Sequence, residues 1–125
     1  MKTEINTLTE TVIGAAIEVH KLLGPGLLES AYQRALEHEL DLRGVRFVAQ
    51  KVCAVTYKGL VIDEAYRLDL LVEEQLVVEL KAVDALADVH EAQVLTYLRF
   101  SECRVGLLIN FCSRLLKDGL QRLSL

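Results

Sequence analysis

The residues from 104 to 112 form an almost unbroken apolar run, and this run limits the fold more than any other part of the sequence. It reads Arg-Val-Gly-Leu-Leu-Ile-Asn-Phe-Cys. A strand with one face in water alternates apolar and polar residues, whereas a strand buried on both faces is apolar at nearly every position. The run therefore predicts a strand in parallel pairing, with a helix packed on each side of it.

Three other segments of the chain show the apolar spacing of helices. Apolar residues recur at three- and four-residue intervals over residues 3–23, 28–43 and 84–101, which is typical of helices that bury one face. A Gly-Pro-Gly sequence at 24–26 ends the first of these helices, and Gly44 suits the C-terminal cap of the second.

Runs rich in β-branched and aliphatic residues predict the other strands. We expect strands over residues 47–57, 66–72 and 76–83, and a stretch from residue 60 that bends near 63–65. A short helical turn over 113–118 and an edge strand over 120–125 follow the buried strand. The order of elements predicts the α/β class, with a central mixed β-sheet flanked by α-helices.

The composition indicates one globular domain over residues 1–125. Hydrophobic residues make up 52% of the chain and charged residues 26%, which excludes a disordered chain. No apolar run approaches the roughly 20 residues that cross a bilayer, and the amino terminus lacks the pattern of a signal peptide. We therefore expect a soluble, cytoplasmic protein without membrane contact. The three cysteines show neither a disulfide framework nor zinc-ligand spacing.

Two neighbouring strands carry the residues with the clearest chemistry. Asp69 lies in the run 66–72, and the triplet Glu79-Leu80-Lys81 lies in the run 76–83, so the two runs read as a hairpin across three polar residues. If Val72 pairs with Leu76, Asp69 stands directly opposite Glu79. A loop of two or four residues would instead pair Asp69 with Leu80 and scatter the acids. The predicted site therefore depends on the register of this hairpin.

Side-chain alternation places Glu79 and Lys81 on one face of their strand, with Leu80 directed into apolar packing. Two carboxylates and a backbone carbonyl suit Mg²⁺ or Mn²⁺, which favour oxygen ligands. The predicted metal ligands here are Asp69, Glu79 and the Leu80 carbonyl, and Lys81 is placed to orient water or to hold a phosphate oxygen. The other interpretation is an exposed strand face with an ordinary Glu/Lys pair.

Polar residues on two helices extend this pattern. Glu29 and Tyr32 are three positions apart at the start of the second helix, and Gln93 and Tyr97 are four apart on the third. Glu29 and the two tyrosines have structural alternatives, since an acid near a helix start interacts well with the helix dipole and tyrosines often pack in a core with a hydrated hydroxyl. His20, near the end of the first helix, is either a structural hydrogen-bonding residue or part of the site.

These motifs together resemble the GxxExxY family of the PD-(D/E)XK nuclease superfamily. The resemblance covers nearly the whole chain and rests on Val19-His20, Leu23-Gly24-Pro25-Gly26, Gly26-x-x-Glu29-x-x-Tyr32, Asp69, Glu79-Leu80-Lys81, Tyr97-Leu98 and the sequence Gly-Leu-Leu-Ile-Asn-Phe at 106–111. It departs from the superfamily in one place, because Leu68-Asp69 replaces the Pro-Asp pair.

The resemblance implies a restriction-endonuclease-like three-layer fold, with the active site where the hairpin opens. It implies that Asp69, Glu79 and Lys81 match the metal-binding and catalytic core. Glu29 would match an acidic residue that some branches contribute from an early helix as a further metal ligand. Gln93 and Tyr97 would match the Gln-x-x-x-Tyr element of exonuclease-like branches.

The leading hypothesis is a Mg²⁺- or Mn²⁺-dependent nuclease that hydrolyses phosphodiester bonds of DNA, with RNA as the second choice. The formal net charge of −4 argues against tight nonspecific binding of nucleic acid, although a divalent cation would neutralise part of an acidic site. The competing hypotheses are a binding or regulatory module that keeps the fold without turnover, and a domain that works only as a homodimer or beside a larger protein partner.

Overall fold

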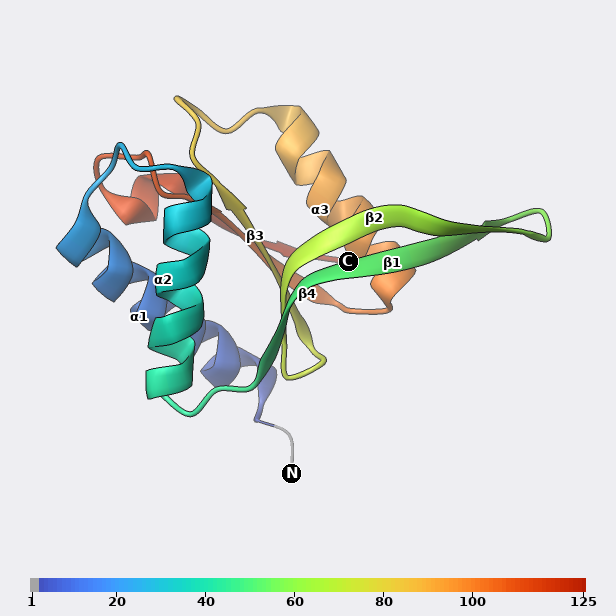
Figure 1. Ribbon diagram of the computed structural model, residues 1–125, viewed down its shortest axis with the longest axis horizontal. Helices are drawn as coiled ribbons and strands as arrows, with labels where there is room; N and C mark the ends of the chain where they lie inside the picture. Colours follow the sequence, from blue (N-terminus) through green and yellow to red (C-terminus); the bar gives the residue numbers. More distant parts are fainter. Residues whose placement is uncertain (1–2) are drawn as a thin grey trace.

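One five-stranded sheet runs through the centre of the molecule in the computed structural model, which describes residues 3–125 (Figure 1). The strands lie in the order β1-β2-β3-β4-β5, with β3 and β4 parallel and every other neighbouring pair antiparallel. The sheet is therefore mixed, as predicted. Its strands are β1 Phe47–Tyr57, β2 Leu60–Val72, β3 Leu76–Lys81, β4 Val105–Asn110 and β5 Leu120–Ser124.

Helices cover both faces of the sheet. Helices α1 (Ile5–Leu23) and α2 (Glu29–Leu42) lie on one face, and α3 (Asp88–Ser101) lies on the other (Figure 1). Side chains of the central strands alternate between the two layers, so Leu107 packs with α1 and α2 while Leu108 packs with α3. The predicted three-layer architecture is confirmed.

Strand β4 explains why the apolar run at 104–112 predicted the fold correctly. All six of its residues are buried, and it pairs in parallel with β3 from Val105 to Asn110. At Gly106 an added Cβ atom would lie 2.8 Å from Val94 Cγ1 of α3. The glycine therefore allows α3 to pack closely against this strand.

The segment between β3 and α3 differs from the prediction. Strand β3 ends at Lys81 and α3 begins at Asp88 rather than at residue 84. The Asn110 side chain accepts a hydrogen bond from Val83 N–H at 3.1 Å and donates one to the Val83 carbonyl at 2.9 Å. These bonds satisfy the backbone of a loop, so neither a longer strand nor an earlier helix is needed.

The predicted bend at 63–65 corresponds to an irregularity within β2, which is one continuous strand. Cys53 pairs with Tyr66 and Val55 with Ile62, so residues 63–65 bulge opposite a single residue of β1. Only its last part, from Leu70 to Val72, pairs with β3. The rest pairs with β1 alone and extends from the body of the molecule as a two-stranded arm, defined here as residues 51–67 (Figure 1). Asp63 and Glu64 are exposed there, since an arm in water on both faces accommodates charge within a strand.

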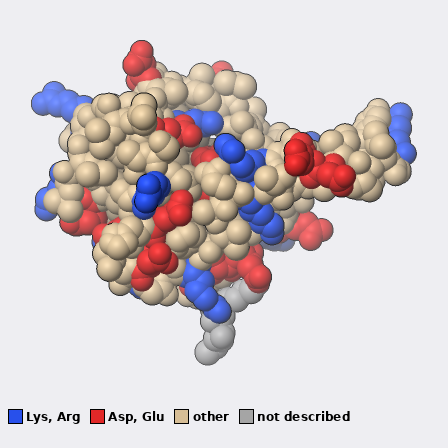
Figure 2. Space-filling model, in the orientation of Figure 1, with Lys and Arg blue, Asp and Glu red and all other residues tan. Residues whose placement is uncertain are grey.

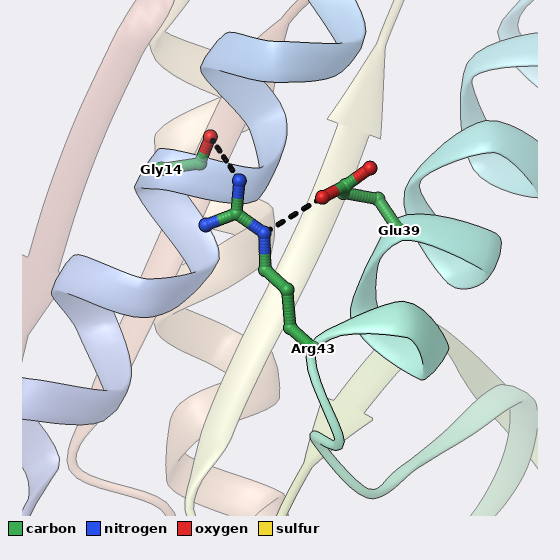
Figure 3. A network of polar contacts seen from close by, with 3 residues as sticks. All are labelled: Gly14, Glu39 and Arg43. Atoms are coloured by element: carbon green, nitrogen blue, oxygen red, sulfur yellow. Dashed lines mark hydrogen bonds and ion pairs between the residues drawn. The ribbon is translucent and has the colours of Figure 1, made fainter.

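Side chains set the start of α1 and link α1 to α2. Helix α1 begins at Ile5 rather than at residue 3, because the Glu4 carboxylate accepts bonds from Asn6 and Thr7 N–H. Directly after the C-terminal end of α2, the Arg43 side chain contacts Glu39 at 2.8 Å and the Gly14 carbonyl of α1 at 3.5 Å (Figure 3). This partly exposed network links the two helices and contributes little stability, about 1 kcal/mol at most.

No helix within residues 3–125 has the length and apolar character to span a membrane.

Candidate active site

The β2–β3 hairpin has the register on which the predicted site depends. Val72 pairs with Leu76 across a three-residue turn, and the pairing continues to Leu70 opposite Val78. Beyond this pair the backbone ladder stops, and the next two residues that face each other are Asp69 and Glu79.

Carboxylates replace backbone carbonyls as acceptors in the open part of the hairpin. The Asp69 N–H donates to Glu79 Oε1 at 3.0 Å, and the Leu80 N–H donates to Asp69 Oδ2 at 2.8 Å. Both side chains are buried, with 7% of Asp69 and 3% of Glu79 exposed. The strands separate without leaving these N–H groups unpaired, and two acidic groups lie in the gap.

Strand β2 changes face at Asp69. Leu70 packs with α1 and α2, whereas Leu68 packs with α3, although strict alternation would place both on one face. On β1, Ala49 pairs with Leu70 and Lys51 pairs with Leu68. Gln50, between them, lies opposite Asp69 and has a φ of +53°. The period of two that predicted the site therefore holds on β3 but breaks on β2, where the ribbon rotates and the arm leaves the sheet.

The six side chains predicted to form the site line one open pocket of about 350 Å³. Strands β2 and β3 contribute Asp69, Glu79 and Lys81 to it, α2 contributes Glu29, and α3 contributes Gln93 and Tyr97. Lys81 Nζ donates to Gln93 Oε1 at 3.0 Å. Residues at the base of the arm complete the lining: Val52, Glu64, Ala65, Tyr66 and Arg67.

Two acidic groups lie close together at the buried end of the pocket. Desolvation, followed by the charge of Asp69, raises the pKa of Glu79 to about 8, and Lys81 offsets only part of this effect. Desolvation and then Asp69 also raise the pKa of Glu29. The pKa of the Tyr97 hydroxyl is raised by desolvation and then by Glu79. A cation placed between the carboxylates would relieve this repulsion.

The donor set fits a hard divalent cation such as Mg²⁺ or Mn²⁺. A strand residue directs its N–H and C=O toward the same neighbour, so the Leu80 carbonyl faces the gap that its N–H shares with Asp69. The Lys81 carbonyl is used by the Phe111 N–H at 2.9 Å. Within residues 3–125 no three His, Cys, Asp or Glu side chains are gathered closely enough to hold one ion. The arranged side-chain donors are therefore Asp69 and Glu79, and Glu29 is farther out.

Gln33 is a residue of this site that the sequence pattern did not single out. Its side chain is buried, and Nε2 donates to the Asp69 carbonyl at 3.0 Å and to Glu37 Oε2 at 2.9 Å. It lies four positions after Glu29 on α2. A polar residue on the buried face of that helix was the signal in the sequence.

Tyr32 and His20 lie outside the pocket lining. The Tyr32 ring is fully buried and stacks on Phe111 at 4.7 Å, and its hydroxyl donates to the Gly24 carbonyl and accepts from Leu27 N–H. His20 Nε2 lies 2.7 Å from the Ser113 carbonyl. The Tyr32 bonds fix the turn before α2 and thereby help to place Glu29. The His20 contact instead links the end of α1 to the segment that follows β4.

Comparison with known families agrees with this geometry. The sequence matches the model of the PD-(D/E)XK nuclease superfamily over residues 6–123. Searches among curated proteins and among solved structures gave no match. Because the family model covers nearly the whole chain, this protein belongs to the PD-(D/E)XK nuclease superfamily and has its restriction-endonuclease-like fold.

Proposed function

We propose that this protein is a divalent-metal-dependent nuclease of the GxxExxY type that hydrolyses phosphodiester bonds of DNA. The observation that carries the proposal is the convergence of Glu29, Asp69, Glu79, Lys81 and Gln93, together with Tyr97, on one pocket. These residues come from four elements that are separated by as many as 68 positions in the sequence, counted from 29 to 97. A fold that needed these polar groups only for solubility would not gather them.

Asp69, Glu79 and the Leu80 carbonyl are the proposed metal ligands. When bound, Mg²⁺ or Mn²⁺ supplies Lewis acidity that activates water and neutralises charge on the phosphate. The two carboxylates are held in place before any ligand arrives, because each accepts a hydrogen bond from the backbone of the facing strand. Glu29 acts from the outer part of the pocket, and it reaches the ion through water.

In this proposal Lys81, which is hydrogen-bonded to Gln93, contacts the substrate. The Lys81 ammonium lies on the same face of β3 as Glu79, and Gln93 holds it at 3.0 Å. In this position it holds a phosphate oxygen or orients the attacking water. Tyr97 adds a hydroxyl to the same wall.

The exposed arm supports a partner in addition to nucleic acid. The arm exposes large apolar side chains, including Tyr57, Leu60 and Val61, each more than half exposed. The chain also carries a formal net charge of −4. We propose a homodimer or a larger protein partner that contributes further contacts to the nucleic acid.

The decisive experiment compares metal-dependent cleavage by the parent and by Asp69→Asn. Loss of several kcal/mol of metal-based stabilisation predicts a fall in rate of more than about 100-fold. Asp63→Asn is the matched control, because Asp63 is an exposed acid on the same strand outside the pocket lining. DNA and RNA of the same sequence, each tested with Mg²⁺ and Mn²⁺, identify the polymer.

Cleavage that survives in Asp69→Asn at the parental rate would refute the proposal. If the parent binds Mg²⁺ and nucleic acid but never cleaves, the protein is instead a binding module that has kept the nuclease fold.

A further inference from the structure

Three aromatic side chains form a continuous strip beside the pocket. Tyr66 of β2 stacks on Tyr97 of α3 with ring centroids 5.0 Å apart and an interplanar angle of 21°. Phe100, one helical turn beyond Tyr97, lies 6.3 Å from Tyr66 in a tilted arrangement. We refer to Tyr66, Tyr97 and Phe100 as the aromatic strip.

The strip is open to solvent at its outer end. Phe100 is 42% exposed, and the two tyrosines are only partly buried. The Arg99 guanidinium lies over the Phe100 ring, 4.9 Å from its centroid. This pair offers an apolar ring and a cation at the same point.

The inner end of the strip is part of the pocket. Tyr66 and Tyr97 line it together with Asp69, Glu79 and Arg67. A chain whose scissile phosphate lies at the carboxylates therefore has its neighbouring bases at the level of these rings.

The charge distribution favours recognition through bases over recognition through phosphates alone. Acidic and basic side chains are interspersed on the face shown in Figure 2, and no broad basic area is seen on it. The net charge is −4. Duplex binders generally grip many phosphates with lysine and arginine, whereas single-strand binders combine a few cations with aromatic rings on which unpaired bases stack.

We propose that the aromatic strip stacks unpaired bases, so that the substrate class is single-stranded nucleic acid or the single-stranded end of a duplex. This inference rests on the proposed nuclease function for the position of the scissile phosphate. Stacking on the strip has no base preference, because each base presents an aromatic face.

The test measures binding by fluorescence anisotropy in EDTA, so that cleavage does not occur. The probes are a short labelled thymidine oligonucleotide, an abasic oligonucleotide of the same length, and a blunt duplex of the same length. The parent should bind the thymidine strand at least about tenfold more tightly than either of the other probes, since stacking is available only to unpaired bases.

Phe100→Ala should weaken binding of the thymidine strand by about 5- to 150-fold, the range for the loss of one stacked base. It should leave the abasic probe unaffected. Phe100→Tyr keeps the ring and should bind like the parent. Leu115→Ala is the matched control, since Leu115 is a 52% exposed apolar residue that lies outside the strip and outside the lining of the pocket.

Equal affinity for the thymidine and abasic strands, or unchanged affinity in Phe100→Ala, would overturn the inference. These results are separable from the nuclease test. Cleavage restricted to blunt duplex would overturn the stacking role and leave the nuclease proposal intact, whereas ring-dependent strand binding without cleavage would support the strip and contradict the nuclease.

Discussion

The two halves of strand β2 behave as different kinds of structure. The inner half, Leu70 to Val72, has strands on both sides and helices on both faces, and its side chains are buried. The outer half, from Leu60 to Arg67, has β1 as its one partner strand and is exposed at nearly every position. Asp69 lies next to the junction, where the ladder with β3 ends and the strand rotates.

This difference shows why the carboxylates gather where they do. Inside the sheet, a buried acid would have no acceptor role, because backbone carbonyls already satisfy each N–H. On the arm, an acid would be hydrated and unable to attract a cation strongly. At the junction the N–H groups of Asp69 and Leu80 are buried and have no backbone carbonyl as partner, and there the carboxylates of Glu79 and Asp69 accept them.

The largest expected effect is a difference in the loss of stability between substitutions in the inner and outer parts of β2. Leu70→Ala removes a fully buried side chain from the core and should lower the free energy of unfolding by about 2–5 kcal/mol. Val61→Ala, at a side chain that is 57% exposed on the arm, should change it by about 0.5 kcal/mol or less. Urea denaturation measures both. Similar losses at the two positions would mean that the arm is packed as firmly as the core.

A smaller effect comes from the pH dependence of the junction. The folded-state pKa of Glu79 is raised from 4.5 to about 8. Between these values the folded protein keeps a proton that the unfolded chain loses, so the contribution of Glu79 to stability is full below pH 4.5 and is lost as the pH rises through 8. Above pH 8 the metal-free protein holds a buried, charged carboxylate.

Glu79→Gln should therefore stabilise the metal-free protein above pH 8, on the order of 2 kcal/mol, because an amide accepts the Asp69 hydrogen bond without charge. Thermal unfolding from acid to alkaline pH measures the difference. Mg²⁺ should reverse the order, since it stabilises the parent and not the variant. A parent that stays more stable than the variant in EDTA at high pH would contradict the assigned cause.

The smallest effect tests the support of Asp69 from α2. Gln33→Leu removes the bond to the Asp69 carbonyl and should cost roughly 1–2 kcal/mol. It should also weaken Mg²⁺ binding by about 10-fold or more, because Asp69 loses a fixed backbone position. Gln75→Leu is the matched control, since Gln75 also donates to a backbone carbonyl, that of Thr3, away from the pocket. Equal Mg²⁺ affinity in the two variants, measured by calorimetry, would show that Gln33 has a structural role only.

Most of the fold was predictable because apolar periodicity is a local signal. The run at 104–112 correctly predicted a buried parallel strand with helices on both sides. The three-residue turn predicted the hairpin register, including the approach of Asp69 to Glu79. The largest error fell where a distant side chain satisfies a backbone group. Asn110 holds the loop before α3 in this way.

The sequence by itself determined the layers, the hairpin register and the set of polar residues from which a site could form, because these depend on spacing along the chain. The tertiary structure alone decided that β2 changes face at Asp69, that Gln33 holds that strand, and that Glu29 stands outside the carboxylate pair. Such features depend on contacts between residues far apart in the chain, and local periodicity carries no information about them.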